Sequence, residues 1–78
     1  MLRRNSKRYF CGVLITERQI TVLEQVITGK SNIEIAKETE ICLSTVKWHL
    51  EELYKIYKVK SRYEMMSLVF KYEAIHGK

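Results

Sequence analysis

The chain has 78 residues, of which 46% are apolar and 29% are charged. A chain of this length forms one small domain with little interior for a catalytic cleft, and its composition excludes an intrinsically disordered protein. Because it contains no proline and only three glycines, it lacks the turn residues that an all-β fold requires. We therefore expect an all-α domain.

The net charge of +5 is concentrated near the N-terminus. The first eight residues include Arg3, Arg4, Lys7 and Arg8, four of the fourteen basic side chains, and the other seventy residues carry ten basic and nine acidic groups. We predict a basic N-terminal arm over residues 1–14 and a domain over residues 15–76. Because the domain is nearly neutral as a whole, any binding to phosphate depends on where its individual charges lie.

The two cysteines do not indicate a metal site. Cys11 and Cys42 stand 31 residues apart, and neither a Cys-x-x-Cys pair nor a Cys/His ligand spacing accompanies them. Two reduced thiols in a cytosolic protein are the preferred interpretation, and a disulfide stays open. The apolar run Tyr9–Ile15 is too short to span a bilayer, and no cleavage-like site follows it. The sequence thus predicts a cytoplasmic protein without a metal or cofactor.

Capping boxes mark the first two helices. The box TERQ at residues 16–19 and the C-terminal glycine Gly29 predict a helix over residues 17–28. The apolar residues between them recur at helical spacing. The box SNIE at residues 31–34 predicts a short helix over residues 32–39.

The next two helices complete a helix-turn-helix layout. A helix is predicted over residues 43–57, with one buried stripe made of Val46, Leu50, Leu53 and Tyr57. A third capping box at residues 61–64 predicts a last helix over residues 62–75. Since a tight turn joins the second and third helices, the arrangement is that of a helix-turn-helix, a four-helix all-α domain.

The stripe on the third helix determines which of its residues face outward. Lys47, Glu51 and Tyr54 lie opposite the stripe, with Ser44 and Trp48 on its flanks. The first turns of such a helix enter the major groove of DNA, where Lys47 reaches guanine edges or phosphates and the hydroxyls of Ser44 and Thr45 lie at the helix start.

Less specific interpretations of these residues stay open. Trp48 fits a core position as well as a DNA contact. His49, next to the buried stripe, is better explained as a partly buried, hydrogen-bonded side chain than as a ligand. Lys47 considered alone is also compatible with a solvated surface residue.

Four motifs together resemble the LuxR/NarL/FixJ-type DNA-binding domain between Ile15 and Leu68. They are TERQ for the usual TxRE start, SNIEIA from Ser31, TVKWHL from Thr45, and YKVKSR from Tyr57 for the usual LGVxSR ending. The resemblance is to the stand-alone, GerE-like format, because the chain shows no receiver or ligand-binding domain. It implies four helices, with the second and third as the helix-turn-helix and the fourth as a dimer interface.

The resemblance also implies site residues. Asn32, Thr45 and Lys47 match DNA-contacting positions of the family, and Trp48 and Glu51 match positions that often read bases. Ser44 and Lys55 complete the predicted DNA-binding set. A dimer of the family binds an inverted or direct pair of half-sites.

The sequence departs from the family pattern at the turns. Glu40 and Lys58 replace the usual glycines. Lys58 therefore either adopts a left-handed backbone conformation, which costs about 1 kcal/mol, or avoids that conformation. Cys42 replaces the usual serine cap, which weakens the start of the third helix by about 0.5–1 kcal/mol unless Ser44 compensates. The pair Glu51 and Glu52 repels phosphate, although Glu51 can accept a hydrogen bond from cytosine N4.

The fourth helix is apolar on more than one side. Its predicted dimer contacts are Met65, Leu68, Val69 and Tyr72, and a helix that is apolar on two sides needs two partners. The alternative is that the segment YFCGVLI (9–15) folds back and covers the second side.

The sequence therefore predicts a non-enzymatic, sequence-specific regulator of transcription that binds double-stranded DNA as a homodimer, with RNA polymerase as a further candidate partner. Neither histidine has nucleophile–base spacing, and no phosphate-cradling glycine loop exists. A sigma-factor-type region is a less favoured relative. The alternative function is a protein-interaction module that heterodimerises with a larger LuxR-type regulator and sequesters it.

Overall fold

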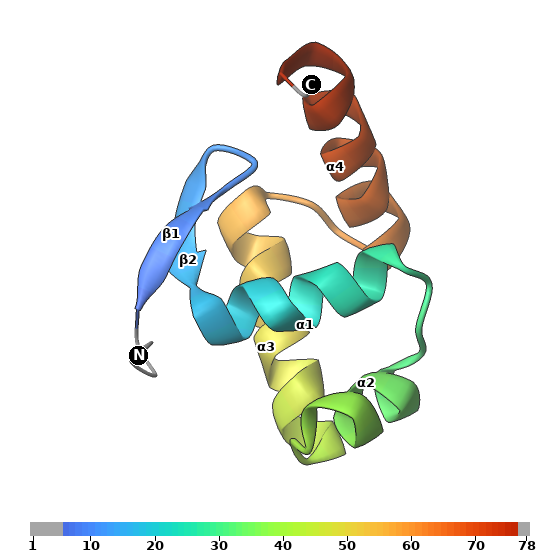
Figure 1. Ribbon diagram of the computed structural model, residues 1–78. Coiled ribbons are helices and arrows are strands. Elements are labelled where there is room, and N and C mark those ends of the chain that lie inside the picture. Colours follow the sequence, from blue (N-terminus) through green and yellow to red (C-terminus); the bar gives the residue numbers. More distant parts are fainter. Residues whose placement is uncertain (1–5, 77–78) are drawn as a thin grey trace.

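The computed structural model describes residues 6–76, which fold into a two-stranded antiparallel sheet and four helices (Figure 1). The elements are β1 (Lys7–Phe10), β2 (Val13–Thr16), α1 (Glu17–Ile27), α2 (Asn32–Thr39), α3 (Leu43–Tyr57) and α4 (Arg62–His76). The predicted class, a four-helix domain with a helix-turn-helix, is confirmed, and a small sheet is added at its N-terminal side.

The helices begin where their capping boxes predict. The Thr16 hydroxyl accepts a hydrogen bond from the Gln19 backbone N–H, and the Gln19 side chain accepts one from the Thr16 N–H, both at 3.0 Å. Ser31 and Glu34 make the same reciprocal pair at the start of α2. Each pair satisfies two backbone donors that the helix start would leave unpaired. The predicted bounds hold to within one residue for every helix.

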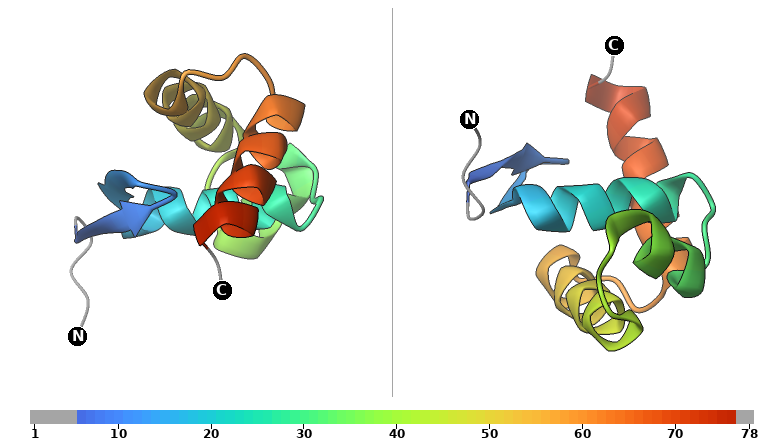
Figure 2. Two further views of the ribbon diagram at one scale, coloured as in Figure 1. Left: turned by 90° about the horizontal axis from the view of Figure 1, so that it is seen from above. Right: turned by 60° about the horizontal axis from the view of Figure 1, so that its bottom comes forward.

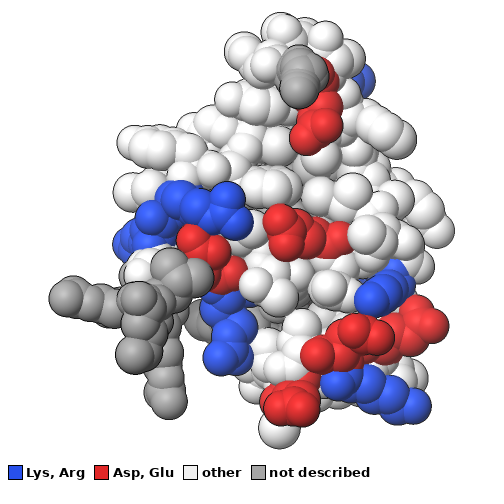
Figure 3. All heavy atoms as spheres, in the orientation of Figure 1, with Lys and Arg blue, Asp and Glu red and all other residues white. Residues whose placement is uncertain are grey.

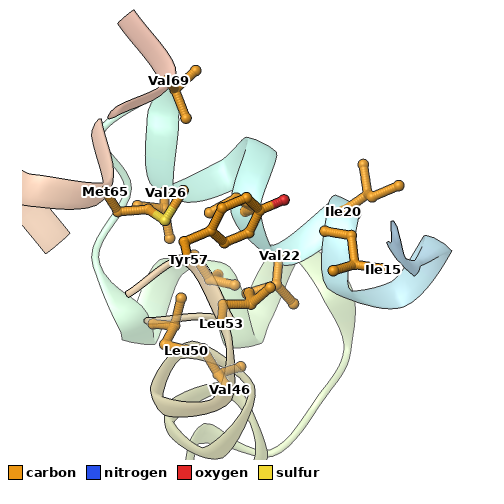
Figure 4. Packing of buried hydrophobic residues seen from close by; sticks show 12 residues of the cluster. Ile15, Ile20, Val22, Val26, Val46, Leu50, Leu53, Tyr57, Met65 and Val69 are labelled. Carbon is orange, nitrogen blue, oxygen red and sulfur yellow. The ribbon is translucent and has the colours of Figure 1, made fainter. Parts of the chain in front are cut away.

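The core lies where α1 crosses α3 and meets the first turns of α4 (Figure 4). The predicted stripe on α3 is buried, and so is the inner face of α1. Twelve residues form this cluster: Ile15, Ile20, Val22, Leu23, Val26, Ile35, Val46, Leu50, Leu53, Tyr57, Met65 and Val69. The core holds α2 and the start of α3 together at one end of the molecule, while the C-terminal half of α4 projects from the other (Figures 1 and 2).

Part of the predicted basic arm forms a hairpin. Residues 7–14 make β1, a turn and most of β2, and Phe10 pairs with Val13 across the turn. Cys11 and Gly12 at the turn both have positive φ, 50° and 82°, as in the type I′ turn that suits the twist of a hairpin. Arg3 and Arg4, the other two basic residues of the predicted arm, lie outside the described residues.

A long-range hydrogen bond ties the hairpin to α3. The Tyr57 hydroxyl donates to the Phe10 carbonyl at 2.6 Å, across 47 residues of sequence. A second contact ties the hairpin to α1: the Arg8 guanidinium forms an ion pair with Glu17 at 2.8 Å. Burial, and to a smaller extent Cys11, raises the pKa of Tyr57 to about 12. The hairpin is therefore part of the folded domain.

Replacing Tyr57 with phenylalanine is expected to lower the free energy of unfolding by about 1 kcal/mol, because the Phe10 carbonyl loses its donor. The raised pKa means that the folded state keeps the phenolic proton after the unfolded state has released it. This contribution is thus fully present below pH 10.0 and is lost as pH rises towards about 12. Urea unfolding of the parent and of Tyr57→Phe, at pH 7 and between pH 10.0 and about 12, should show that the difference between their free energies of unfolding narrows as the pH rises. Tyr63→Phe, at an exposed position, should have the same free energy of unfolding as the parent.

Two residues other than glycine end helices in the left-handed region. Glu40 (φ 58°) follows α2 and Lys58 (φ 60°) follows α3, at the two positions where the family pattern has glycine. Of the two alternatives that the sequence leaves for Lys58, the structure shows the left-handed one. A side chain with a Cβ is strained in this conformation, whereas glycine is not.

Lys58→Gly is accordingly expected to raise the free energy of unfolding by about 0.5–1 kcal/mol, the relieved strain less the added freedom of the unfolded chain. Thermal unfolding followed by circular dichroism should show the midpoint rise by a few degrees, roughly 2–6 °C. Lys55→Gly, inside α3, is the matched control and should lower it. A fall with both variants would show that Lys58 is not strained.

Candidate nucleic-acid interface

The helix-turn-helix unit is built by α2, a left-handed turn at Glu40, and α3. The Ile41 backbone N–H donates to the Ala36 carbonyl at 3.2 Å, which closes the turn. Cys42 is the N-cap of α3, and its thiol makes no capping hydrogen bond, as expected from its weak acceptor strength. Residues 42–44 are exposed, so the start of α3 lies open to solvent at one end of the molecule (Figure 1).

The outward face of α3 agrees with its predicted orientation. Ser44, Lys47, Glu51 and Lys55 are exposed, and Thr45 is half-buried. Trp48 is 55% exposed, which decides between core and surface in favour of the surface. Exposed side chains on an unobstructed helix face are the geometric requirement for insertion into a groove of DNA.

A groove beside α3 brings predicted and unpredicted residues together. Two adjoining hollows share Asn32, Lys47 and Arg62; one extends to Glu51 and Tyr54, and the other to the loop before α2. Arg62 and Tyr54 are absent from the predicted site. For Arg62 the sequence offers only its place in the KSR motif, because its contacts are with residues some thirty positions earlier.

The charges of this interface are mixed. Lys47 and Arg62 line both hollows, and Lys30 lines one of them. Glu51 forms no ion pair among the described residues, whereas a Glu52 carboxylate oxygen lies 3.8 Å from Lys55 Nζ. Figure 3 shows acidic and basic groups side by side over the lower part of one face, and few charges over α4. Burial raises the pKa of Tyr54, although the Arg62 cation opposes this. The surface thus favours particular contacts over general attraction to phosphate.

His49 lies on the flank of this face. Its imidazole is half-buried, as predicted, and its ring packs against the Trp48 ring at a centroid distance of 5.2 Å, with the two planes inclined by 64°. Burial, with the Arg18 cation as a second cause, lowers the pKa of His49. The predicted hydrogen bond is not found at Nδ1, which is buried without a partner among the described residues. His49 therefore supports the packing of α3 instead of facing the groove.

The predicted dimer contacts on α4 require a correction. Met65 is fully buried and Val69 is 6% exposed, because both pack into the core of their own chain, so neither is open to a partner. Leu68 and Tyr72 are half-buried, and the hairpin turn approaches Tyr72 closely: a Cβ on Gly12 would lie 3.6 Å from the Tyr72 ring. The segment before α1 thus covers part of α4, while Phe70 and Ile75 remain 77% and 75% exposed.

Within residues 6–76, no group of three or more histidine, cysteine or acidic side chains is placed to hold a metal ion. None of the described helices combines the length and apolarity that crossing a membrane requires.

A short helix, a tight turn and a longer helix with an exposed outer face define the chain as a helix-turn-helix domain. Residues 13–69 match the family of bacterial regulatory proteins known as the luxR family, and the chain belongs to that family. The resemblance drawn from the four motifs is confirmed.

Three curated relatives of the chain are longer proteins. The HTH-type transcriptional regulator AlkS of Pseudomonas putida is 36% identical over 59 residues, covering 76% of this chain and 7% of the relative. AlkS of Alcanivorax borkumensis is 42% identical over 53 residues, covering 68% and 6%. The response regulator protein VraR of Staphylococcus aureus is 31% identical over 75 residues, covering 96% and 36%. The chain therefore spans about a third or less of their length. No solved structure matches significantly.

Proposed function

We propose that this chain binds double-stranded DNA through α3 and regulates transcription, acting in the bacterial cytoplasm. The single observation that carries the proposal is the exposed face of α3, on which Lys47 stands beside Asn32 in one groove. The names of the relatives, a transcriptional regulator and a response regulator, agree with this role.

The residues of α3 divide into those that contact base edges and those that contact the sugar-phosphate backbone of DNA. Lys47 reaches guanine O6 and N7, and Glu51 accepts from cytosine N4. Trp48 packs against sugars or thymine methyl groups. This division explains how a domain with almost no net charge gains specificity from few contacts.

The backbone contacts come from the helix ends. Ser44 and Thr45 offer hydroxyls at the start of α3, where the backbone N–H groups also favour an anion. Lys55 contacts the DNA backbone further along α3, and Asn32 contacts it from the first position of α2. These contacts fix the register of α3 on the duplex.

We further propose a homodimer through α4. Leu68, Tyr72 and Ile75 recur at helical spacing and form one stripe, which borders the hollow between α4 and the end of α3. Met65 and Val69 are not part of it, because they belong to the core. Two linked domains bind two half-sites with a combined affinity that one domain does not reach.

Selection of bound sequences from random duplex DNA tests the proposal. We expect a motif with two half-sites, and an affinity that falls steeply between low and physiological salt as counterions are released. If no motif is enriched and the protein instead forms a stable complex with a longer luxR-family regulator, the chain is the sequestering module and the DNA-binding proposal is wrong.

A further inference from the structure

We propose that Arg62 is a positioning residue: it holds the side-chain amide of Asn32 so that the amide donates to a phosphate oxygen of DNA in the groove beside Lys47. The inference rests on the proposed function and adds to it a residue from α4, outside the helix-turn-helix.

Arg62 bridges two parts of the chain that lie far from it in sequence. Its Nη1 donates to the Lys30 carbonyl at 2.8 Å, and its Nη2 donates to Asn32 Oδ1 at 2.5 Å. The guanidinium is planar and presents its N–H groups in a fixed fork, so one side chain serves both acceptors at once. Arg62 is the first residue of α4 and Asn32 the first of α2, so this bridge joins the two helix starts.

The chemistry of arginine determines the orientation of the asparagine amide. A guanidinium has donors only, so the atom that it meets on Asn32 has to be the carbonyl oxygen. The Nδ2 group of Asn32, with two donors, is then directed away from Arg62. No hydrogen bond from Nδ2 occurs within residues 6–76, so both donors are available to a ligand.

The surroundings fit a phosphate. Asn32, Arg62 and Lys47 line both hollows of the groove, and Lys47 is exposed there. The amide donors of Asn32 can reach an anionic phosphate oxygen there, a charge-assisted contact of the kind that fixes a protein on duplex DNA, and the positive charge of Lys47 makes the groove more favourable for that anion. Arg62 is half-buried and both of its described hydrogen bonds are to protein, so it acts through Asn32.

A double-mutant cycle on the folded protein tests this role. The variants are Arg62→Lys, which keeps the charge but loses the fork, Asn32→Ala, and both together; Arg8→Lys, in the exposed pair with Glu17, is the matched control. We expect Arg62→Lys to weaken binding of the selected duplex about fivefold or more, and to cause no further loss once Asn32 is alanine. Arg8→Lys should bind as the parent does, and thermal midpoints should establish that each variant is folded at the assay temperature.

Additive losses would overturn the inference, because they mean that Arg62 contacts DNA independently of Asn32. So would an unchanged affinity of Arg62→Lys, which would leave the bridge a purely structural one.

A second measurement needs no DNA. In nuclear magnetic resonance spectra of the free protein, the side-chain NH₂ group of Asn32 should be ordered in the parent and in Arg8→Lys, and mobile in Arg62→Lys. An amide that stays ordered without the guanidinium would also refute the positioning role. If the parent binds no duplex, the proposed function fails, whereas this spectrum still reports whether Arg62 orients Asn32.

Discussion

Lys47→Ala is expected to weaken binding to the selected duplex about tenfold or more. Lys47 is the exposed cation at the centre of the α3 face, and a contact with a guanine edge is lost with its ammonium. Fluorescence anisotropy with the labelled duplex, at several salt concentrations, would measure both the affinity and its dependence on salt.

The salt dependence separates the two possible contacts of Lys47. If Lys47 contacts a phosphate, the slope of log affinity against log salt concentration becomes smaller by about one in Lys47→Ala. If Lys47 contacts a base, the slope stays the same and the variant loses its preference for one base at one position of the DNA site. Lys60→Ala, which removes one positive charge from the loop between α3 and α4, is the control and should bind like the parent. Equal affinity of Lys47→Ala and the parent would remove Lys47 from the groove.

Ile75→Glu is expected to convert the proposed dimer into a monomer. Ile75 belongs to the stripe with Leu68 and Tyr72 but is 75% exposed, so the change places a charge in the dimer interface without disturbing the core of the monomer. Binding to a duplex with two half-sites should fall about 100-fold, because the two domains no longer assist each other, while binding to one half-site should stay the same.

Phe70→Glu is the matched control for this experiment. Phe70 is 77% exposed and borders the hollow on the other side of α4, between that helix and α1, so its replacement should leave the dimer intact. Sedimentation velocity of the two variants would decide. A monomer only with Phe70→Glu would assign the interface to the opposite side of α4, and two persisting dimers would exclude both sides.

The helices could be predicted from the sequence because their ends are local features. The reciprocal hydrogen bonds of Thr16 with Gln19 and of Ser31 with Glu34 join residues three positions apart, so their partners stand in one short motif. The stripe on α3 is equally local: its four residues are buried, and Lys47 on the opposite side of the helix is exposed.

The hairpin and the groove could not be predicted in the same way. The bond from Tyr57 to Phe10 and the bridge from Arg62 to Asn32 join residues 47 and 30 positions apart, and no periodicity reports such pairs. On α4 the apolar residues spread around the helix, so only the packing itself shows that Met65 and Val69 face inward and Ile75 does not.

The uncapped start of α3 has a consequence for how the domain would meet its target. Because the thiol of Cys42 accepts nothing, the backbone N–H groups of residues 43–45 have no protein acceptor among the described residues, and in the free protein they are left to water. An incoming phosphate would replace that water and supply the cap which a serine gives in other helices. Docking would then stiffen the end of the helix that does the reading, and the protection of these amides from hydrogen exchange would rise on binding.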